Sequence, residues 1–369
     1  MDSRTNRPEK KLKMKLSTLC LLFLFLCHGA FAQEAKPAVE YISEDVTFPN
    51  KVDSITLAGT FSFPQTNGKF PAVIIISGSG GQNRDGLMLG HKPYQVIADH
   101  LTKNGFAVLR YDDRGIGAST GVMKGADIAD FTRDAKAALV YLRSRKEVDT
   151  KKTGIIGHSE GGAIGLAVAA EDPSLGFLVS MAGPGVDGVQ MILAQTEAIY
   201  RNMGMKDSMV RIKVAEQRAM VTAIAEEPDT AKLKARIAEN AQIQYAANPS
   251  LKPSVTEDNY TKMLVNAYMV PEYLSIIRFD PAKYYPSVKC PVLAMNGAKD
   301  IQVISSVNLA GWQKGIRGVT IKELPGLNHL FQECRTCSVQ EYKTITQTIS
   351  PAALDELTSW ARQITGLQK

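Results

Sequence analysis

One short segment places a serine where it could act as a nucleophile. The sequence GHSEG, residues 157–161, follows an apolar run at 153–157 and precedes a run of small residues at 161–170. G-x-S-x-G between a strand and a helix is typical of a nucleophile elbow, a sharp turn whose glycines let other backbone approach closely. Alone the pattern is weak, and its alternative is a glycine turn whose serine caps a helix. The strand–turn–helix context favours Ser159 as a nucleophile.

A serine hydroxyl needs a neighbouring base, and the chain offers one histidine in the right order. Hydrolases with this elbow place the acid after the serine and the histidine after the acid. Of the histidines, His329 follows Ser159 in the chain, in a loop after the predicted strand 319–323. We therefore predict His329 as the general base. His158 is expected to pack beneath the elbow.

The base in turn needs a carboxylate that fixes its tautomer. Asp300 lies in the turn that leaves the predicted strand 291–295, between the nucleophile and the base in sequence. An aspartate in such a turn often caps the backbone instead. Its position in the chain favours Asp300 as the acid, with Glu323 as a weaker alternative.

Two backbone N–H groups are expected to stabilise the oxyanion. One belongs to Glu160, directly after the nucleophile. The other is expected in the glycine-rich loop after the predicted strand 72–76, where Ser79 is the first choice and Gly80 the second. This loop lacks the Lys-Ser/Thr ending of a phosphate-binding loop, so the sequence does not favour nucleotide binding.

Alternating strands and helices must position these residues. Residues 41–63 alternate as paired antiparallel strands do, and short apolar runs typical of buried strands then alternate with helical patterns. The sequence thus predicts an α/β fold with a mostly parallel, doubly wound sheet and an inserted helical cap. Residues 186–288 form the predicted cap, and 33–185 with 289–369 the core. Asp112-Asp113 is interpreted as a structural turn rather than a catalytic carboxylate pair.

Seven methionines fall within the predicted cap. Methionine is flexible and polarisable, so it suits an adaptable wall over a substrate as well as the filling of gaps in a helical core. Of the two, we favour the filling of gaps in a helical core. These residues are Met191, Met203, Met205, Met209, Met220, Met263 and Met269.

Several segments of the chain resemble those of a known superfamily. The segments SGSGGQNRDG, RYDDRGIGAS, GHSEGG, NGAKDIQV and LPGLNHLFQ are similar to the motif set of bacterial α/β hydrolases, nearest to esterase-like and serine-aminopeptidase-like members. The resemblance covers residues 33–369 except the cap, and it implies an α/β-hydrolase fold and the triad Ser159, Asp300 and His329. Ser77 departs from it, because many relatives carry histidine there.

The N-terminus has the pattern of an export signal. Lysines precede the apolar run 16–31, and an A-x-A sequence stands before Gln33, so residues 1–32 are predicted to be a cleaved signal peptide. The protein is then periplasmic or secreted, with no stable membrane span after cleavage. The alternatives are an uncleaved anchor and a lipoprotein attached at Cys27. Translation starts at Met1 or at Met14.

Charge and cysteines limit the partners. The formal charge is +6, and six basic against two acidic residues precede Gln33, so the rest of the chain carries +2, which gives no reason to expect nucleic-acid binding. Cys290, Cys334 and Cys337 remain. Further zinc ligands at suitable spacing are missing from the sequence, and the C-x-x-C pair is interpreted as a small disulfide beside the His329 loop rather than a redox motif.

Together these features predict a carboxylesterase that acts on small or medium acyl groups and forms an acyl-enzyme on Ser159. Such a mechanism needs no metal and no organic cofactor. The alternatives are an exported aminopeptidase-like serine peptidase and a non-catalytic binding protein on a hydrolase scaffold. The sequence does not reveal the acyl and alcohol parts of the substrate or the oligomeric state.

Overall fold

The computed structural model describes residues 41–368. The predicted signal peptide at 1–32, Cys27 and the alternative start at Met14 lie outside this range. Within it, none of the helices combines the length and the apolar character that crossing a bilayer requires.

A single eight-stranded sheet forms the centre of the fold, in the order β1-β2-β4-β3-β5-β6-β7-β8. Strands β1 and β2 form a hairpin, β2 runs antiparallel to β4, and every other neighbouring pair is parallel. The predicted mostly parallel sheet is therefore confirmed. The strands are β1 (Tyr41–Asn50), β2 (Ile55–Pro64), β3 (Phe70–Ile76), β4 (Ala107–Tyr111), β5 (Val148–His158), β6 (Phe177–Met181), β7 (Val292–Gly297) and β8 (Thr320–Leu324).

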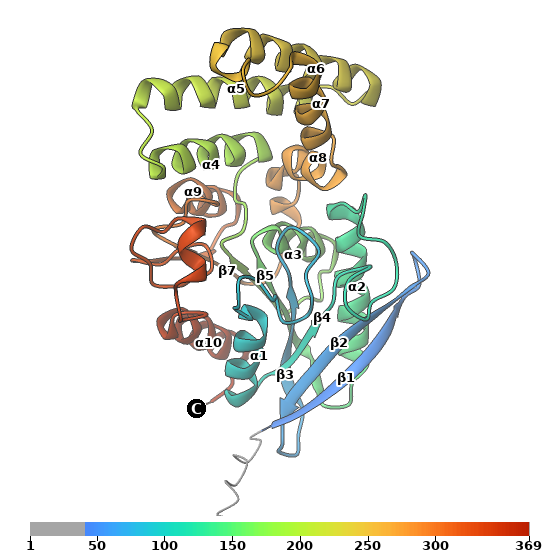
Figure 1. Cartoon of the computed structure of the whole chain (residues 1–369). Coiled ribbons are helices and arrows are strands. Elements are labelled where there is room, and N and C mark those ends of the chain that lie inside the picture. The colour runs from blue at the N-terminus through green and yellow to red at the C-terminus, as the bar shows by residue number, and fades with distance from the viewer. Residues whose placement is uncertain (1–40, 369) are drawn as a thin grey trace, which may run out of the picture. The chain divides into compact units, whose positions relative to one another are not determined.

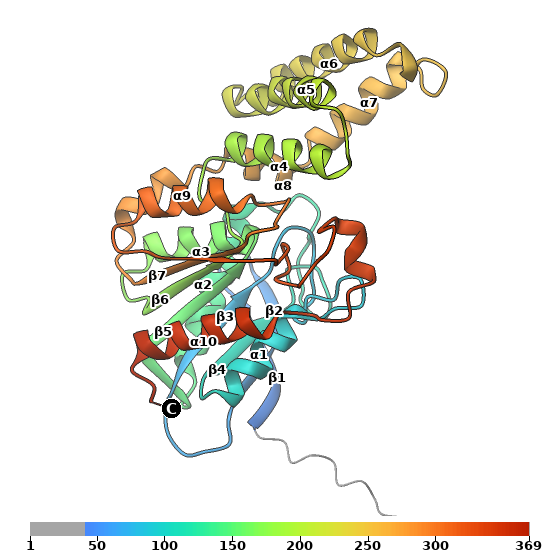
Figure 2. The same ribbon diagram turned by 90° about the vertical axis from the view of Figure 1, so that its left-hand side faces the viewer.

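Helices cover both faces of this sheet, which explains the continuous apolar runs in its strands (Figures 1 and 2). Along β3, Ile74 and Ile76 pack into one core with α2 and α3, whereas Val73 and Ile75 pack into the other with α1 and α10. These four helices are α1 (Pro93–Lys103), α2 (Ile128–Ser144), α3 (Glu160–Glu171) and α10 (Pro351–Thr365). The core also contains α9 (Ser305–Gly315). Helix α9 was not predicted from the sequence.

Five helices lie between β6 and β7, beyond the carboxyl ends of the strands (Figure 1). They enclose a hydrophobic cluster of their own, centred on Met220, Leu233 and Ile237. Of the seven methionines in this block, Met220 is fully buried and Met203 is largely exposed. The helices are α4 (Gly188–Asn202), α5 (Asp207–Glu226), α6 (Thr230–Ala247), α7 (Glu257–Tyr268) and α8 (Pro271–Arg278).

Candidate active site

The turn between β5 and α3 has the geometry of a nucleophile elbow. Ser159 adopts φ 55° and ψ −122°, a strained conformation for a residue with a side chain. The flanking glycines are required by contact with backbone: a Cβ at Gly157 would lie 2.0 Å from the carbonyl oxygen of Gly161, and one at Gly161 would lie 2.4 Å from that of Ile76. The fold therefore holds this serine in a conformation that exposes its hydroxyl to the cavity above the sheet.

The loops after β7 and β8 bring Asp300 and His329 together. The Nδ1 nitrogen of His329 lies 2.7 Å from Oδ2 of Asp300, and both side chains are buried. A carboxylate only accepts, so Nδ1 carries the proton and Nε2 is left to accept one. The other oxygen of Asp300 accepts the backbone N–H groups of Gln302 and Val303, which fixes the carboxylate in place. Glu323, the weaker alternative, instead accepts a hydrogen bond from Ser305.

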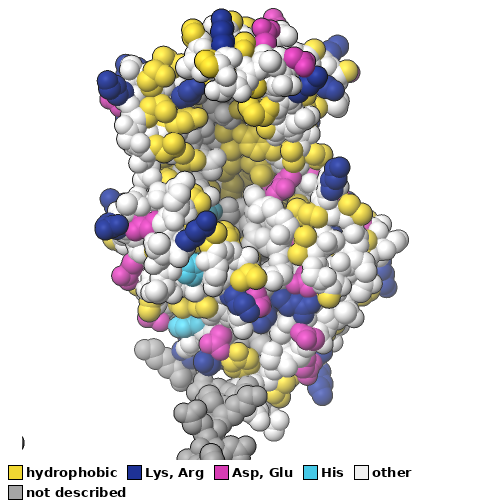
Figure 3. All heavy atoms as spheres, in the orientation of Figure 1, with side chains coloured by type: hydrophobic (Ala, Val, Ile, Leu, Met, Phe, Trp, Pro, Cys, Tyr) yellow, Lys and Arg dark blue, Asp and Glu magenta, His cyan; other side chains and the backbone are white. Residues whose placement is uncertain are grey.

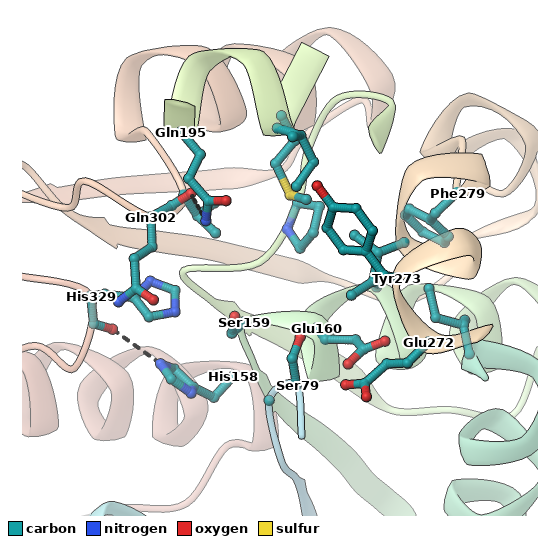
Figure 4. A pocket seen from close by; sticks show the side chains of 18 of the residues that line it. Ser79, His158, Ser159, Glu160, Gln195, Glu272, Tyr273, Phe279, Gln302 and His329 are labelled. Carbon is teal, nitrogen blue, oxygen red and sulfur yellow. Dashed lines mark hydrogen bonds between the residues drawn. The ribbon is translucent and has the colours of Figure 1, made fainter. Parts of the chain in front are cut away.

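One cavity of about 480 Å³ contains Ser159 and His329 (Figure 4). Within residues 41–368 no hydrogen bond joins the serine hydroxyl to the histidine ring. Such a bond is often loose before a substrate binds and tightens in the reacting complex. The walls come from the core and from α4 and α8, and the space-filling view shows hydrophobic side chains in the hollow between these parts (Figure 3).

The two predicted oxyanion donors face the same cavity. Glu160 is the first residue of α3, where an N–H group has no acceptor inside the helix. The N–H of Gly80 donates to Oε1 of Glu272 at 2.6 Å, whereas that of Ser79 has no acceptor among the described residues. This difference favours Ser79 over Gly80 as the second donor.

Asp113 fixes the loop that carries Ser79, a role that the sequence did not reveal. Its carboxyl accepts the hydroxyl of Ser77 at 2.7 Å and the backbone N–H of Gln82 at 2.8 Å, and burial raises its pKa to about 7. The interpretation of Asp112-Asp113 as a structural turn thus misses a link to the site. Ser77, the departure from the family pattern, supplies one end of that link.

A buried chain of hydrogen bonds connects the three loops of the site. The N–H of Gly78 donates to the Tyr94 hydroxyl at 3.0 Å, and this hydroxyl lies 3.3 Å from Nδ1 of His158. Nε2 of His158 donates to the backbone carbonyl of His329 at 3.0 Å, as the dashed line in Figure 4 marks. Burial lowers the pKa of His158 to about 4, so its ring stays neutral, with the proton on Nε2 and with Nδ1 able to accept from the Tyr94 hydroxyl.

Replacing Tyr94 by phenylalanine is expected to break this chain and to lower the free energy of unfolding by about 1–3 kcal/mol, because Gly78 N–H and His158 Nδ1 lose their partner while buried. Urea denaturation measures the loss. Tyr284→Phe is the matched control, since its hydroxyl makes no hydrogen bond within residues 41–368. Equal free energies of unfolding in the two variants would show that the hydrogen bonds of Tyr94 contribute nothing to stability.

The pKa of the Glu160 side chain is also strongly shifted. Its pKa is raised to about 8 by burial and then by the charge of Glu272. Between its ordinary value of 4.5 and about 8, the folded protein keeps a proton that the unfolded chain releases, so Glu160 lowers stability progressively as pH rises through this interval. Urea unfolding at pH 5 and pH 8.5 is expected to show Glu160→Gln gaining a few kcal/mol over the wild type at the higher pH. A constant difference at both pH values would contradict this assignment.

The predicted disulfide is present in the structure between Cys334 and Cys337, five residues beyond the base. Cys290 is a free thiol. Thiol titration of the unreduced, denatured protein without residues 1–32 is therefore expected to find one reactive thiol, and three after reduction. Three thiols before reduction would refute the bond.

Comparison with known proteins places these features in a class. The fold, the elbow and the carboxylate–histidine pair are those of an α/β hydrolase. A family model described as serine aminopeptidase, S33, matches residues 86–330, and the chain belongs to that family.

Two characterised relatives show the range of proteins to which this chain is similar. It is 31% identical over 235 residues to the quorum-quenching protein AidA of Acinetobacter baumannii, covering 62% of this chain and 70% of AidA. It is 26% identical over 186 residues to esterase EstD of Thermotoga maritima, covering 49% of this chain and 44% of EstD.

Solved structures agree on the fold. The α/β hydrolase GrgF from Penicillium sp. sh18 superposes with a TM-score of 0.55 at 17% identity, covering 88% of this chain and 100% of GrgF. The Pyrococcus furiosus esterase Pf2001 superposes with a TM-score of 0.51 at 16% identity, covering 88% of this chain and 92% of Pf2001.

Proposed function

We propose that this protein is a serine hydrolase that cleaves carboxylic esters with small or medium acyl groups. The observation that carries the proposal is the buried hydrogen bond between Asp300 and His329, in loops that border the same cavity as Ser159 on its strained turn. A nucleophile, a base with a free nitrogen and an acid that orients the base are the groups that acyl transfer requires. The esterase EstD among the relatives supports the choice of esters.

The proposed reaction has two steps. His329 takes the hydroxyl proton through Nε2 as Ser159 Oγ attacks the ester carbonyl, and the backbone N–H groups of Glu160 and Ser79 stabilise the oxyanion. The imidazolium, held by Asp300, gives its proton to the leaving alcohol as the C–O bond breaks. Water, deprotonated by His329, then attacks the acyl-enzyme and releases the acid, restoring the serine hydroxyl.

Helices α4–α8 act in this proposal as a cap that selects the substrate, because α4 and α8 supply part of the cavity wall. Met191 of α4 lines the cavity, as an adaptable wall over a substrate would require. We further propose that the protein is exported and that its mature chain begins at Gln33, which N-terminal sequencing of the exported protein tests.

Covalent labelling combined with substrate comparison tests the function. A fluorophosphonate is expected to label the protein on the peptide that contains Ser159, as mass spectrometry would detect. Turnover of p-nitrophenyl acetate and butyrate is expected to exceed that of leucine p-nitroanilide. Preference for the anilide would indicate a peptidase, and absence of labelling would indicate a binding protein.

A further inference from the structure

Two carboxyl groups border the candidate active-site cavity without a basic partner. Glu160 follows the nucleophile at the start of α3, and Glu272 lies in the first turn of α8. Both line the cavity that contains Ser159, and no lysine or arginine is among its lining residues within 41–368. Figure 4 shows the two carboxyl groups close together in this cavity. An acidic pair on this wall therefore lacks the counter-charge that buried carboxylates normally have.

The Glu160 side chain has an oxygen available for a ligand. The residue is 4% exposed, and its Oε1 is buried without a hydrogen-bond partner. Glu272 is held against the core through the N–H of Gly80. Repulsion from Glu272 and from Asp113 adds to burial in raising the pKa of Glu160, so this side chain retains a proton near neutral pH. The pair therefore keeps one proton between its two carboxyl groups, and a ligand that brings one positive charge can take the place of that proton.

The surrounding wall favours an organic cation over a metal ion. The aromatic rings of Tyr273 and Phe279 line the same cavity as the pair, as Figure 4 shows, and so does the aliphatic side chain of Ile276. Aromatic faces attract ammonium groups, and this attraction strengthens where water is excluded. Calcium requires six to eight oxygen ligands, which two carboxyls in an apolar wall do not supply. Among residues 41–368 no group of three potential metal ligands occurs.

We propose that Glu160 and Glu272 bind an ammonium group of the substrate beside Ser159, so that this hydrolase selects positively charged esters. The inference rests on the proposed function and adds the substrate class. An ammonium group would supply the missing partner of the buried oxygen and replace the proton on Glu160. The geometry does not assign the charge to the acyl or the alcohol side, so both are tested.

The test uses two pairs of esters of matched shape. Butyrylcholine and 3,3-dimethylbutyl butyrate differ by a charge on the alcohol, and the p-nitrophenyl esters of 6-aminohexanoate and heptanoate differ by a charge on the acyl chain. In at least one pair, kcat/KM of the wild type is expected to favour the cation by tenfold or more. This ratio is expected to fall at least tenfold in Glu272→Gln and in Glu160→Gln. It is also expected to rise with pH through about 8, as Glu160 loses its proton.

Glu239→Gln is the matched control, because Glu239 is an exposed glutamate of the same block, on α6 and away from the cavity. It is expected to keep the wild-type ratio. A wild-type preference for the neutral ester in both pairs, or an unchanged ratio in Glu272→Gln, would overturn the inference. A shift in thermal stability without a change in ratio would assign the pair to holding α8 on the core, and would overturn it equally.

Calorimetric binding to the Ser159→Ala protein separates this inference from the proposed function. Tighter binding of butyrylcholine or the 6-aminohexanoate ester than of its neutral counterpart supports the ammonium site, even if the wild type hydrolyses none of the four esters. That absence of hydrolysis would refute the esterase alone. Equal binding of charged and neutral esters, with hydrolysis intact, would refute the ammonium site alone.

Discussion

Replacing Ser159 by alanine is expected to lower kcat for p-nitrophenyl butyrate by about 10⁵–10⁶-fold, which leaves only the residual rate that binding and the oxyanion donors supply. The substitution removes the atom that attacks the carbonyl. The histidine, its carboxylate and the oxyanion donors remain, but they have no acyl-enzyme to form or resolve. Stability is expected to be equal to or above that of the wild type, because the elbow keeps its backbone and loses only a hydroxyl.

Initial rates with the ester, together with thermal unfolding, measure this effect. Ser208→Ala is the matched control, since Ser208 is an exposed serine of α5. It is expected to keep wild-type turnover. A folded Ser159→Ala protein with more than one hundredth of the wild-type kcat would contradict the assignment of Ser159 as the nucleophile.

Replacing Asp300 by asparagine is expected to lower kcat by about 10⁴-fold with little change in the fold. The amide oxygen can still accept the N–H groups of Gln302 and Val303. Its NH₂ group then faces Nδ1 of His329 and donates where the carboxylate accepted. The ring therefore moves its proton to Nε2, the nitrogen that must receive the serine proton.

Glu323→Gln makes the same carboxylate-to-amide change outside this contact, because Glu323 is bonded to Ser305. Its kcat is expected to stay within about threefold of the wild type, as is usual for an exposed change that leaves a contact in place. A loss below tenfold in Asp300→Asn, or an equal loss in both variants, would remove Asp300 from the role of acid.

The sequence was sufficient to predict the mostly parallel sheet and the order of the candidate catalytic residues along the chain. Buried strands such as β3 can be recognised in the sequence as short apolar runs, because parallel strands are covered on both faces. The glycines around Ser159 could likewise be recognised as parts of a nucleophile elbow, since the elbow needs positions where no Cβ can be accommodated. Asp300 and His329 follow from chain order, and the structure joins them through a hydrogen bond. Helix α9 was missed, since its apolar periodicity is weak.

Tertiary structure alone decided the partners of these groups. Tyr94 contacts His158 across 64 positions of the chain, and Gly80 contacts Glu272 across 192. No local pattern encodes such pairs, because a hydrogen bond between distant segments depends on where the sheet and the helices bring their ends. The pKa of Glu160 is likewise set by burial and by the nearby Glu272 rather than by its neighbours in sequence. The sequence determined which residues are candidates for catalysis, and the packing determined which groups hold them in place and which charges lie beside them.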